Sequence, residues 1–253
     1  MNWTQRLQAL LLMGMGLFLY SRVSSGVVLF YINQRFMTLT LLTAVALMVV
    51  GVSFYFRPER QDEEDDQLAS SWQLATRRRI RQPVSIWGLL IISLPIVLGL
   101  LVPPQPLGTA ALANREINLS GLGPAVAVPG SALSAIPPLE KNVMDWLADF
   151  QRTPDPAHFN GQEAQVIGFV YRDGRFTPDS FMVGRFIVSC CVADAAPIGL
   201  IVVWDEALSL TDNTWVEVYG RFEAQEFNGR LMPVLIAETV TVTTAPAQPY
   251  LYY

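Results

Sequence analysis

The sequence has few of the residues on which catalytic sites depend. It contains one histidine and two cysteines in 253 residues, and charged residues make up only 15% of it. It has no Gly-x-Ser-x-Gly elbow, no Walker lysine motif and no His-Glu-x-x-His helix. The serine hydrolases, P-loop nucleotide hydrolases and zinc proteases that these motifs define are therefore excluded. The sequence predicts a protein that is not an enzyme.

The apolar residues concentrate in the first hundred positions, where long runs carry no charge. Hydrophobic residues make up 51% of the chain, and its mean hydropathy is +0.33. Residues 37–56 and 84–102 contain no charged side chain. Each run is long enough to cross about 30 Å of hydrocarbon at about 1.5 Å per residue. Pro95 in the second run is compatible with a transmembrane helix, so both runs are predicted to span a membrane.

A third candidate span, residues 7–31, has a charge within it, at Arg22. One interpretation is a single tilted helix in which Arg22 snorkels or contacts a partner inside the membrane. A shorter span followed by an interfacial turn is the second interpretation. A cleaved signal peptide with Arg6 as its basic region is the third, and it is disfavoured because no clear Ala-x-Ala site is present. We therefore expect three spans, within a membrane region that covers residues 1–103.

Arginine placement predicts how these spans are oriented. The loop at residues 57–83 carries six arginines, whereas the connection before it contains only Arg35. Loops rich in arginine stay in the cytoplasm, so we expect a cytoplasmic N-terminus and a C-terminal half outside the cytoplasm. The acidic run at residues 62–66 is interpreted as a solvated stretch. Four of the arginines are expected to contact lipid headgroups and set the topology: Arg77, Arg78, Arg79 and Arg81.

The C-terminal half predicts a linker and then a small β domain. Residues 104–136 are rich in proline, glycine and alanine, which indicates a linker. Pro137 can open a short amphipathic helix that ends near Arg152. Residues 137–253 are then expected to form an exported domain with an Asn228-Gly229 hairpin turn. Five strands are predicted there: residues 164–171, 185–192, 198–204, 215–222 and 231–242.

The predicted fold class is therefore membrane α plus all-β. Three N-terminal transmembrane helices precede one short helix and a small β-barrel, whose strand order and long last strand favour an OB-like barrel. Other small β-sandwiches remain alternatives. Many OB-folds bind nucleic acid, but residues 103–253 hold eight basic and sixteen acidic side chains. This negative charge repels a phosphate backbone, so we expect no nucleic-acid partner.

The two cysteines, Cys190 and Cys191, are adjacent. Successive side chains of a regular strand point to opposite faces, so the two thiols are expected to diverge unless a bulge turns one of them. One interpretation is a buried Cys190 with Cys191 filling a corner of the barrel. A second is a soft or borderline metal site, for zinc or copper, formed with Asp194 and with His158 as a further candidate. A third is a thiol redox site; the absence of Cys-x-x-Cys excludes a thioredoxin-like motif.

The chain resembles the YcgQ-like family of bacterial permease subunits along nearly its whole length. The most specific match is the double-cysteine stretch, residues 184–195. The family usually has a proline in the loop after the first span, where this chain has Asn33-Gln34, so the conformation of that loop is left open. The other matching stretches are residues 16–20, 25–26, 31–35, 168–170, 197–199, 215–220 and 249–251.

The resemblance implies an accessory subunit of a bacterial inner-membrane permease. In this interpretation the chain is multi-pass, and its helices dock beside a larger multi-span transporter. Arg22 is the candidate for the contact inside the membrane, because a charge at that depth needs a partner. The alternative is a membrane-tethered module that binds a metal or senses redox state through its adjacent cysteines.

Overall fold

The computed structural model of the protein divides into two compact units. The structure describes residues 3–56, 86–112 and 136–252. The helical unit comprises Met1–Val28 and Gln34–Pro104, and the β unit comprises Leu29–Asn33 and Gln105–Tyr253. A short segment between the first two helices therefore belongs to the β unit.

Some of the predicted features lie outside the described residues. They are the cytoplasmic loop 57–83, with its lipid-contacting arginines Arg77, Arg78, Arg79 and Arg81, and most of the linker 104–136. These assignments stay predictions.

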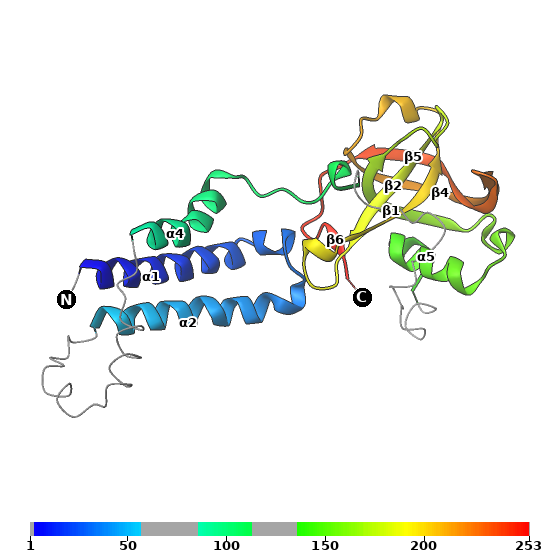
Figure 1. Cartoon of the computed structure of the whole chain (residues 1–253). Helices are drawn as coiled ribbons and strands as arrows, with labels where there is room; N and C mark the ends of the chain where they lie inside the picture. The colour runs from blue at the N-terminus through cyan, green and yellow to red at the C-terminus, as the bar shows by residue number, and fades with distance from the viewer. Residues whose placement is uncertain (1–2, 57–85, 113–135, 253) are drawn as a thin grey trace, which may run out of the picture. The chain divides into compact units, whose positions relative to one another are not determined.

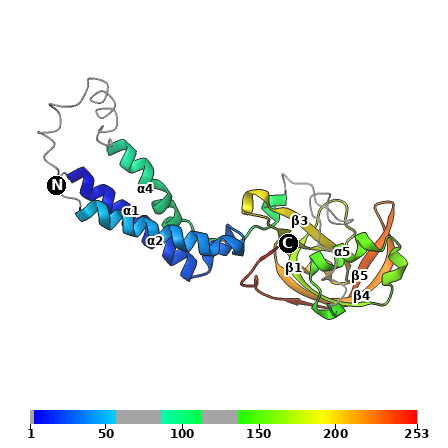
Figure 2. The same cartoon turned by 90° about the horizontal axis from the view of Figure 1, so that it is seen from below.

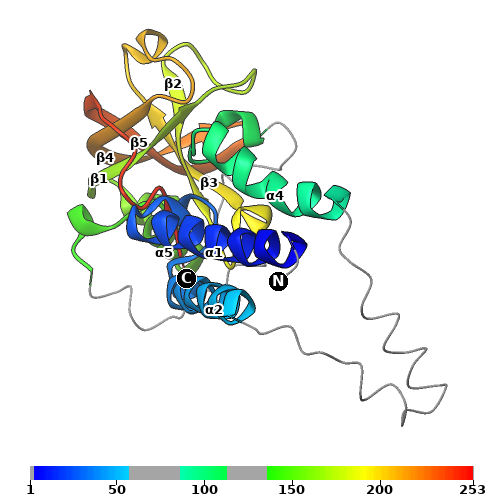
Figure 3. The ribbon, with the colours of Figure 1, turned by 90° about the vertical axis from the view of Figure 1, so that its left-hand side faces the viewer.

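Apolar helices form the described part of the helical unit (Figure 2): α1 (Trp3–Ser24), α2 (Met37–Phe56) and α4 (Ile86–Leu101). α1 and α2 run alongside each other (Figure 3). Two described stretches are long and apolar enough to cross a membrane, Arg6–Ser24 and Gln34–Phe56. α2 has the bounds that its uncharged run predicts. The apolar part of α4, Trp87–Leu101, is shorter, so a membrane crossing by α4 stays a proposal.

The first helix is shorter than the predicted span 7–31. α1 ends at Ser24, and Gly26 follows with a φ of 72°, a left-handed conformation that commonly ends helices. The chain then forms the short helices η1 (Val27–Phe30) and η2 (Gln34–Phe36) before α2 begins. A single long helix through this region is therefore wrong, and a shorter span followed by a turn describes the structure.

Small residues let α1 and α2 approach closely. Ala9 and Gly16 are spaced seven apart on α1, as are Ala44 and Gly51 on α2, and both alanines are fully buried. A Cβ added at Gly51 would lie 2.7 Å from Cγ of Met13, and one at Gly16 would lie 2.7 Å from the carbonyl oxygen of Ala44. Such residues let helix backbones come close together. This matters in a membrane, because lipid tails are as apolar as leucine and the hydrophobic effect does not drive two helices together there.

We expect Gly51→Leu to destabilise the α1–α2 pair by about 1–3 kcal/mol, the usual effect of overpacking. Gly14→Leu is the matched control, because a Cβ at Gly14 on the same helix pair would meet nothing within 4 Å. Thermal unfolding of the detergent-solubilised chain, followed by far-UV circular dichroism, measures both variants. Equal effects at the two positions would contradict the close packing.

The described part of the β unit carries one α-helix and a mixed six-stranded sheet (Figure 1). The strands are β1 (Glu163–Tyr171), β2 (Ser180–Ile187), β3 (Ala196–Val203), β4 (Trp215–Phe227), β5 (Arg230–Val242) and β6 (Tyr250–Leu251). The helical segments are η4 (Thr109–Leu112), η6 (Pro138–Glu140), α5 (Val143–Arg152), η7 (Pro156–Phe159), η8 (Val192–Asp194) and η9 (Ala207–Ser209).

The sheet is partly closed. Its strand order is β1-β4-β5-β3-β2-β6, and β1 also pairs with β2. The pairs β3–β5 and β2–β6 are parallel, and the other pairs are antiparallel. The predicted hairpin turn is confirmed: Asn228 and Gly229 join β4 to β5 with φ values of 51° and 76°.

α5 closes one side of the core. Its cap residue Asn142 and Asp145 form a reciprocal capping box, and the helix ends at Arg152, as predicted. Trp146 is fully buried and its ring centroid lies 4.7 Å from that of Phe222 on β4. The apolar face of this helix is therefore part of the core of the β unit.

The second strand begins and ends earlier than predicted. β2 covers Ser180–Ile187 rather than residues 185–192, and all its residues are buried. A strand buried on both faces has no alternating pattern to mark its ends. This shift decides where the cysteines lie.

Candidate functional site

The two cysteines lie in a loop, not in a strand. We call residues 188–194 the thiol loop; it begins after β2 ends at Ile187. Cys190 is exposed, Cys191 is half-buried, and both are free thiols. Their sulfurs lie 3.7 Å apart. The prediction of divergent thiols is therefore wrong, because the chain leaves the strand before it reaches them, and so is the interpretation of Cys190 as a buried core residue.

One carboxylate organises the thiol loop. Oδ1 of Asp194 accepts a hydrogen bond from the amide of Ser189 (3.1 Å), and Oδ2 accepts one from the amide of Cys190 (2.7 Å). The Cys190 thiol also bonds to this carboxylate and to Cys191, which raises the pKa of Cys190 from 9.0 to about 11. Cys190 is therefore a neutral thiol at pH 7.

The hydrogen bonds also act on the carboxylate. Burial raises the pKa of Asp194, but the bonds from the Cys190 thiol and from neighbouring amides outweigh it and lower the pKa below its usual 3.8. Because the folded-state pKa is lowered, the stability that Asp194 contributes is complete above the unfolded pKa and is lost as pH falls through the folded one. The loop is thus held by an ionised carboxylate at neutral pH.

The chain between α1 and α2 also contacts the thiol loop. We call Leu29–Asn33 the α1–α2 connection. Ile32 and Cys191 form an antiparallel β-bridge. The amide of Val192 donates to the carbonyl of Tyr31 (2.9 Å). A segment that is distant in sequence therefore pairs with the backbone beside the thiols.

Asn33 is the buried centre of this contact, with 1% of its surface exposed. Its amide donates to the carbonyl of Cys190 (3.0 Å). Its side-chain Nδ2 donates to the carbonyls of Ser189 (2.8 Å) and Val188 (3.3 Å). The loop conformation at Asn33 could not be predicted from the sequence, because all three acceptors of its hydrogen bonds lie more than 150 positions away.

Tyr250 on β6 ties both connections to the β unit. Its hydroxyl donates to the carbonyl of Phe30 (3.1 Å), within the α1–α2 connection. It also accepts a hydrogen bond from the amide of Leu107 (2.8 Å), on the segment that follows α4. One side chain therefore joins the two places where the chain enters the β unit.

Arg185 holds the segment that leads to β6. It is 7% exposed and donates to the carbonyls of Ile167 (3.2 Å) and Gln248 (3.0 Å). Its guanidinium lies 5.3 Å from the ring centroid of Trp215. Burial lowers the pKa of Arg185 to about 10, so it stays charged at neutral pH.

Two family models together match most of the chain. The DUF1980 N-terminal domain matches residues 7–118, and the DUF1980 C-terminal domain matches residues 132–253. This chain belongs to the DUF1980 family. The resemblance inferred from the double-cysteine stretch is therefore confirmed.

Two curated relatives share about a hundred residues with this DUF1980 chain. The "Putative two-component membrane permease complex subunit" of Streptococcus mutans is 32% identical over 100 residues, which are 38% of this chain and 36% of that protein. The "UPF0703 protein YcgQ" of Bacillus subtilis is 26% identical over 100 residues, 38% of this chain and 35% of that protein. The match thus spans about a third of the relatives' length. The first name describes a subunit of a membrane permease complex, and neither name gives an enzyme class.

The structure brings only two of the predicted metal ligands, the two thiols, face to face. Among the described residues, no three His, Cys, Asp or Glu side chains are placed to hold a metal ion. Cys190 and Cys191 face each other, but the oxygens of Asp194 already accept hydrogen bonds. His158 lies in η7, where its ring packs edge-on against Phe159 at 5.2 Å. The predicted metal site stays a prediction.

Arg22 has a partner inside the helical unit. Its Nη2 donates to the carbonyl of Gly99 on α4, and its guanidinium lies 5.1 Å from the ring centroid of Phe18. The Gly99 carbonyl has no helical donor four residues on, because that residue is Pro103. Arg22 therefore caps the end of α4, and its contact with a separate permease stays a prediction.

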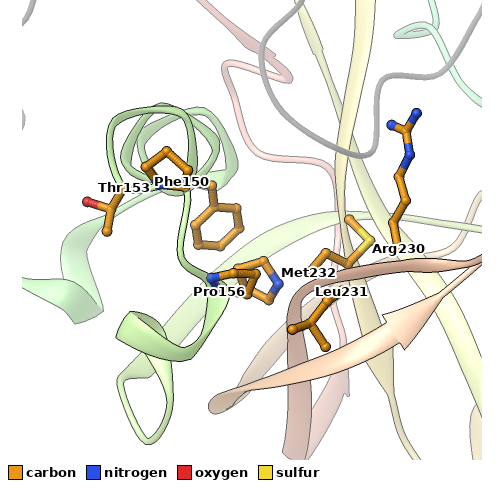
Figure 4. Close-up of a pocket in the computed structure, with 8 residues that line it drawn as sticks. Phe150, Thr153, Pro156, Arg230, Leu231 and Met232 are labelled. Carbon is orange, nitrogen blue, oxygen red and sulfur yellow. The ribbon is translucent and has the colours of Figure 1, made fainter.

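A shallow groove of about 480 Å³, including its open mouth, lies where α5 and η7 face the start of β5 (Figure 4). Its lining contains neither cysteines nor acids: Phe150, Thr153, Pro154, Pro156, Arg230, Leu231, Met232 and Pro233. None of these residues belongs to the thiol loop. The groove is therefore separate from the thiol loop.

We expect Asp194→Asn to speed the alkylation of Cys190 by about ten- to a hundredfold at fixed pH. Removing the negative acceptor lets the pKa of Cys190 fall from about 11 toward 9.0, which increases the thiolate fraction tenfold for each unit. The rate is measured with iodoacetamide in a Cys191→Ser background. Asp205→Asn, an exposed acid outside the loop, is the matched control; an unchanged rate in Asp194→Asn would contradict the assignment.

Proposed function

We propose that this chain is an accessory subunit of a membrane permease complex, with its β unit held outside the cytoplasm beside a larger multi-span partner. The observation that carries the proposal is the contact between the α1–α2 connection and the thiol loop. The name of the Streptococcus mutans relative supports the permease partner. The membrane is the bacterial inner membrane in this proposal.

Chain connectivity supports the proposed topology. Leu29–Asn33 belongs to the β unit, which favours a topology in which the end of α1 and the start of α2 face the compartment that holds the β unit. Residues 105–112 belong to that unit too, and they follow α4. If α2 crosses the membrane, the chain must cross again to bring them back. This supports a third crossing by α4, with a cytoplasmic N-terminus as the arginines predict.

The helical unit favours a subunit over a stand-alone transporter. Three helices are too few to enclose a path for a solute. Many of their apolar side chains are exposed, including Leu42 (62%), Ile91 (69%) and Leu101 (73%). Such surfaces need lipid or protein to cover them.

A detergent pull-down of the tagged full-length chain tests the permease partner. We expect a multi-span membrane protein to co-purify in fixed ratio, identified by mass spectrometry. If only lipid and this chain are recovered under several mild detergents, the subunit assignment is wrong.

Arg22→Leu separates two roles of this arginine. The lost bond to Gly99 should lower the thermal midpoint of the isolated chain. If Arg22 also contacts the permease, co-purification is lost under conditions where the variant stays folded, and unchanged co-purification would contradict that contact. Arg6→Leu, an exposed arginine near the start of the same helix, is the control.

The topology is tested with the native cysteines. A membrane-impermeant maleimide should label Cys190 or Cys191 on intact spheroplasts, and a Cys190→Ser/Cys191→Ser chain gives the background. In that background, Ser70→Cys in the predicted cytoplasmic loop should be labelled only after lysis. The reverse pattern would place the β unit in the cytoplasm.

The β unit supports an OB-like barrel. Five strands follow the closed order β1-β4-β5-β3-β2-β1, with a parallel β3–β5 pair. The short helix α5 precedes the barrel in sequence. An experimental structure of the full chain that shows β1 and β2 unpaired would exclude this fold.

A second candidate function is a membrane-tethered metal-binding module. The two exposed sulfurs 3.7 Å apart favour it, because they offer two soft ligands to one ion such as Zn²⁺. Calorimetric titration of the full-length chain with Zn²⁺ should show one site that is lost in Cys190→Ser and in Cys191→Ser. No binding by the unmutated chain would remove this candidate.

A further inference from the structure

The thiol pair is placed to react with itself. The chain contains only these two cysteines, so each has no other cysteine partner within its own molecule. Their sulfurs lie 3.7 Å apart, and Cys190 is exposed to solvent. A small disulfide compound can therefore reach one thiol while the second stands beside it.

A bond between adjacent cysteines requires their backbone to move. Neighbouring Cα atoms across a trans peptide are about 3.8 Å apart, below the usual disulfide range of roughly 4.4–6.8 Å. The sulfurs must approach from 3.7 Å to about 2.05 Å. Because the separation of the neighbouring Cα atoms cannot lengthen, the torsions of Cys190 and Cys191 and the peptide that joins them must change. The strain falls on this peptide and on the hydrogen bonds it makes.

That peptide is the one that holds the α1–α2 connection. Its carbonyl, on Cys190, accepts the amide of Asn33 (3.0 Å). Cys191 is the residue that forms the bridge with Ile32, and the next amide, of Val192, donates to the same connection. The reactive pair and the contact that joins the helices to the β unit therefore share one backbone segment.

We propose that Cys190 and Cys191 form a reversible thiol–disulfide site whose oxidation releases the α1–α2 connection from the thiol loop. A small-molecule disulfide, RSSR, is the oxidant. One cysteine thiolate attacks it and releases RS⁻; the second cysteine then displaces the other RS⁻ and closes the ring. Two protons and two electrons leave the cysteine pair, and two RSH molecules form.

The reduced state is the one that the structure shows. In this state the carboxylate of Asp194 accepts hydrogen bonds from the amides of Ser189 and Cys190 and holds the loop in place. The inference goes beyond the proposed permease role and does not depend on it, because every contact involved lies within the β unit. A failed pull-down would leave this site unaffected.

The test uses the full-length chain in detergent, treated with oxidised glutathione at mildly alkaline pH and compared with the reduced chain. Intact mass spectrometry should show the loss of two hydrogens per chain, without a retained glutathione adduct or a cross-linked dimer. Hydrogen exchange at the amides of Asn33 and Val192 should rise about tenfold or more, and a reductant should restore it.

Cys191→Ser separates disulfide closure from other effects of the oxidant. This variant should gain at most one glutathione and keep the slow exchange of Asn33. Absence of the internal disulfide in the unmutated chain overturns the proposal. So does a disulfide that forms while exchange at Asn33 and Val192 stays unchanged, because the site would then not control the connection.

Discussion

Gly220→Val should destabilise the β unit by more than about 3 kcal/mol, in the range of severe core substitutions. The β4–β5 ladder shifts register between Tyr219 and Gly220, which brings the backbones of the two strands together. A Cβ at Gly220 would overlap the carbonyl oxygen of Ile236 and lie 2.8 Å from Cα of Ala237. These are backbone atoms, so no side chain can rotate away to relieve the overlap.

Gly174→Val is the matched control for this substitution. Gly174 lies between β1 and β2, and a Cβ there would meet nothing within 4 Å. Urea unfolding of the full chain, followed by tryptophan fluorescence, measures both variants. Trp146 is a suitable reporter because its ring contacts Phe222, two residues after the shift. A Gly220→Val chain as stable as the control would refute the close strand approach.

The second large effect is expected at Asn33. Asn33→Ala should cost about 2–4 kcal/mol, because it leaves the carbonyls of Val188 and Ser189 without their side-chain donor in a buried site. Asn33→Asp should be worse, since it places carboxylate oxygens against the same carbonyls. Urea unfolding gives the stability, and hydrogen exchange at Val192 reports whether the thiol loop has been released.

Gln34→Ala is the control for both variants, since Gln34 is the exposed neighbour of the buried asparagine. If Gln34→Ala and Asn33→Ala have equal effects, the stabilising role belongs to the turn as a whole. A specific loss at Asn33 would show that the side-chain amide holds the loop. It would also explain how this chain fixes a connection that lacks the proline expected in its family.

The membrane part was predictable where composition alone decides the structure. The run at residues 37–56 has no charge, and α2 has the same bounds. The end of α1 was not predictable from hydropathy, because the apolar pattern continues beyond Ser24 to Val27 and Val28. The left-handed conformation of Gly26 ends the helix there, and a glycine in a hydrophobic run does not by itself predict that conformation.

The β strands were predictable from periodicity and turn chemistry, with one consequential exception. The Asn228-Gly229 turn and the strands around it were located correctly because a two-residue type I′ turn has a local signature. β2 was predicted too late in the chain, since a strand buried on both faces carries no alternation and Gly184 and Arg185 interrupt its apolar run. The error moved both cysteines into a strand and gave the wrong direction to their thiols.

Only some residues of the candidate site could be predicted from the sequence. Cys190, Cys191 and Asp194 stood out by residue type and spacing. Asn33 and Tyr250 did not, because hydrogen bonds to distant carbonyls leave no periodic or motif signal. β6 was missed for the same reason: two residues pair with β2 without a strand-length pattern.

The bond between Tyr250 and Phe30 sets an order of events during synthesis. The two residues are 220 positions apart, so the tyrosine leaves the ribosome roughly 10–40 s after its partner at common elongation rates. Throughout that interval the α1–α2 connection lacks the strand that will anchor it. A protease that acts on nascent chains would therefore meet Leu29–Asn33 before its partners in the β unit have been made, and slow synthesis of the β unit would lengthen that exposure.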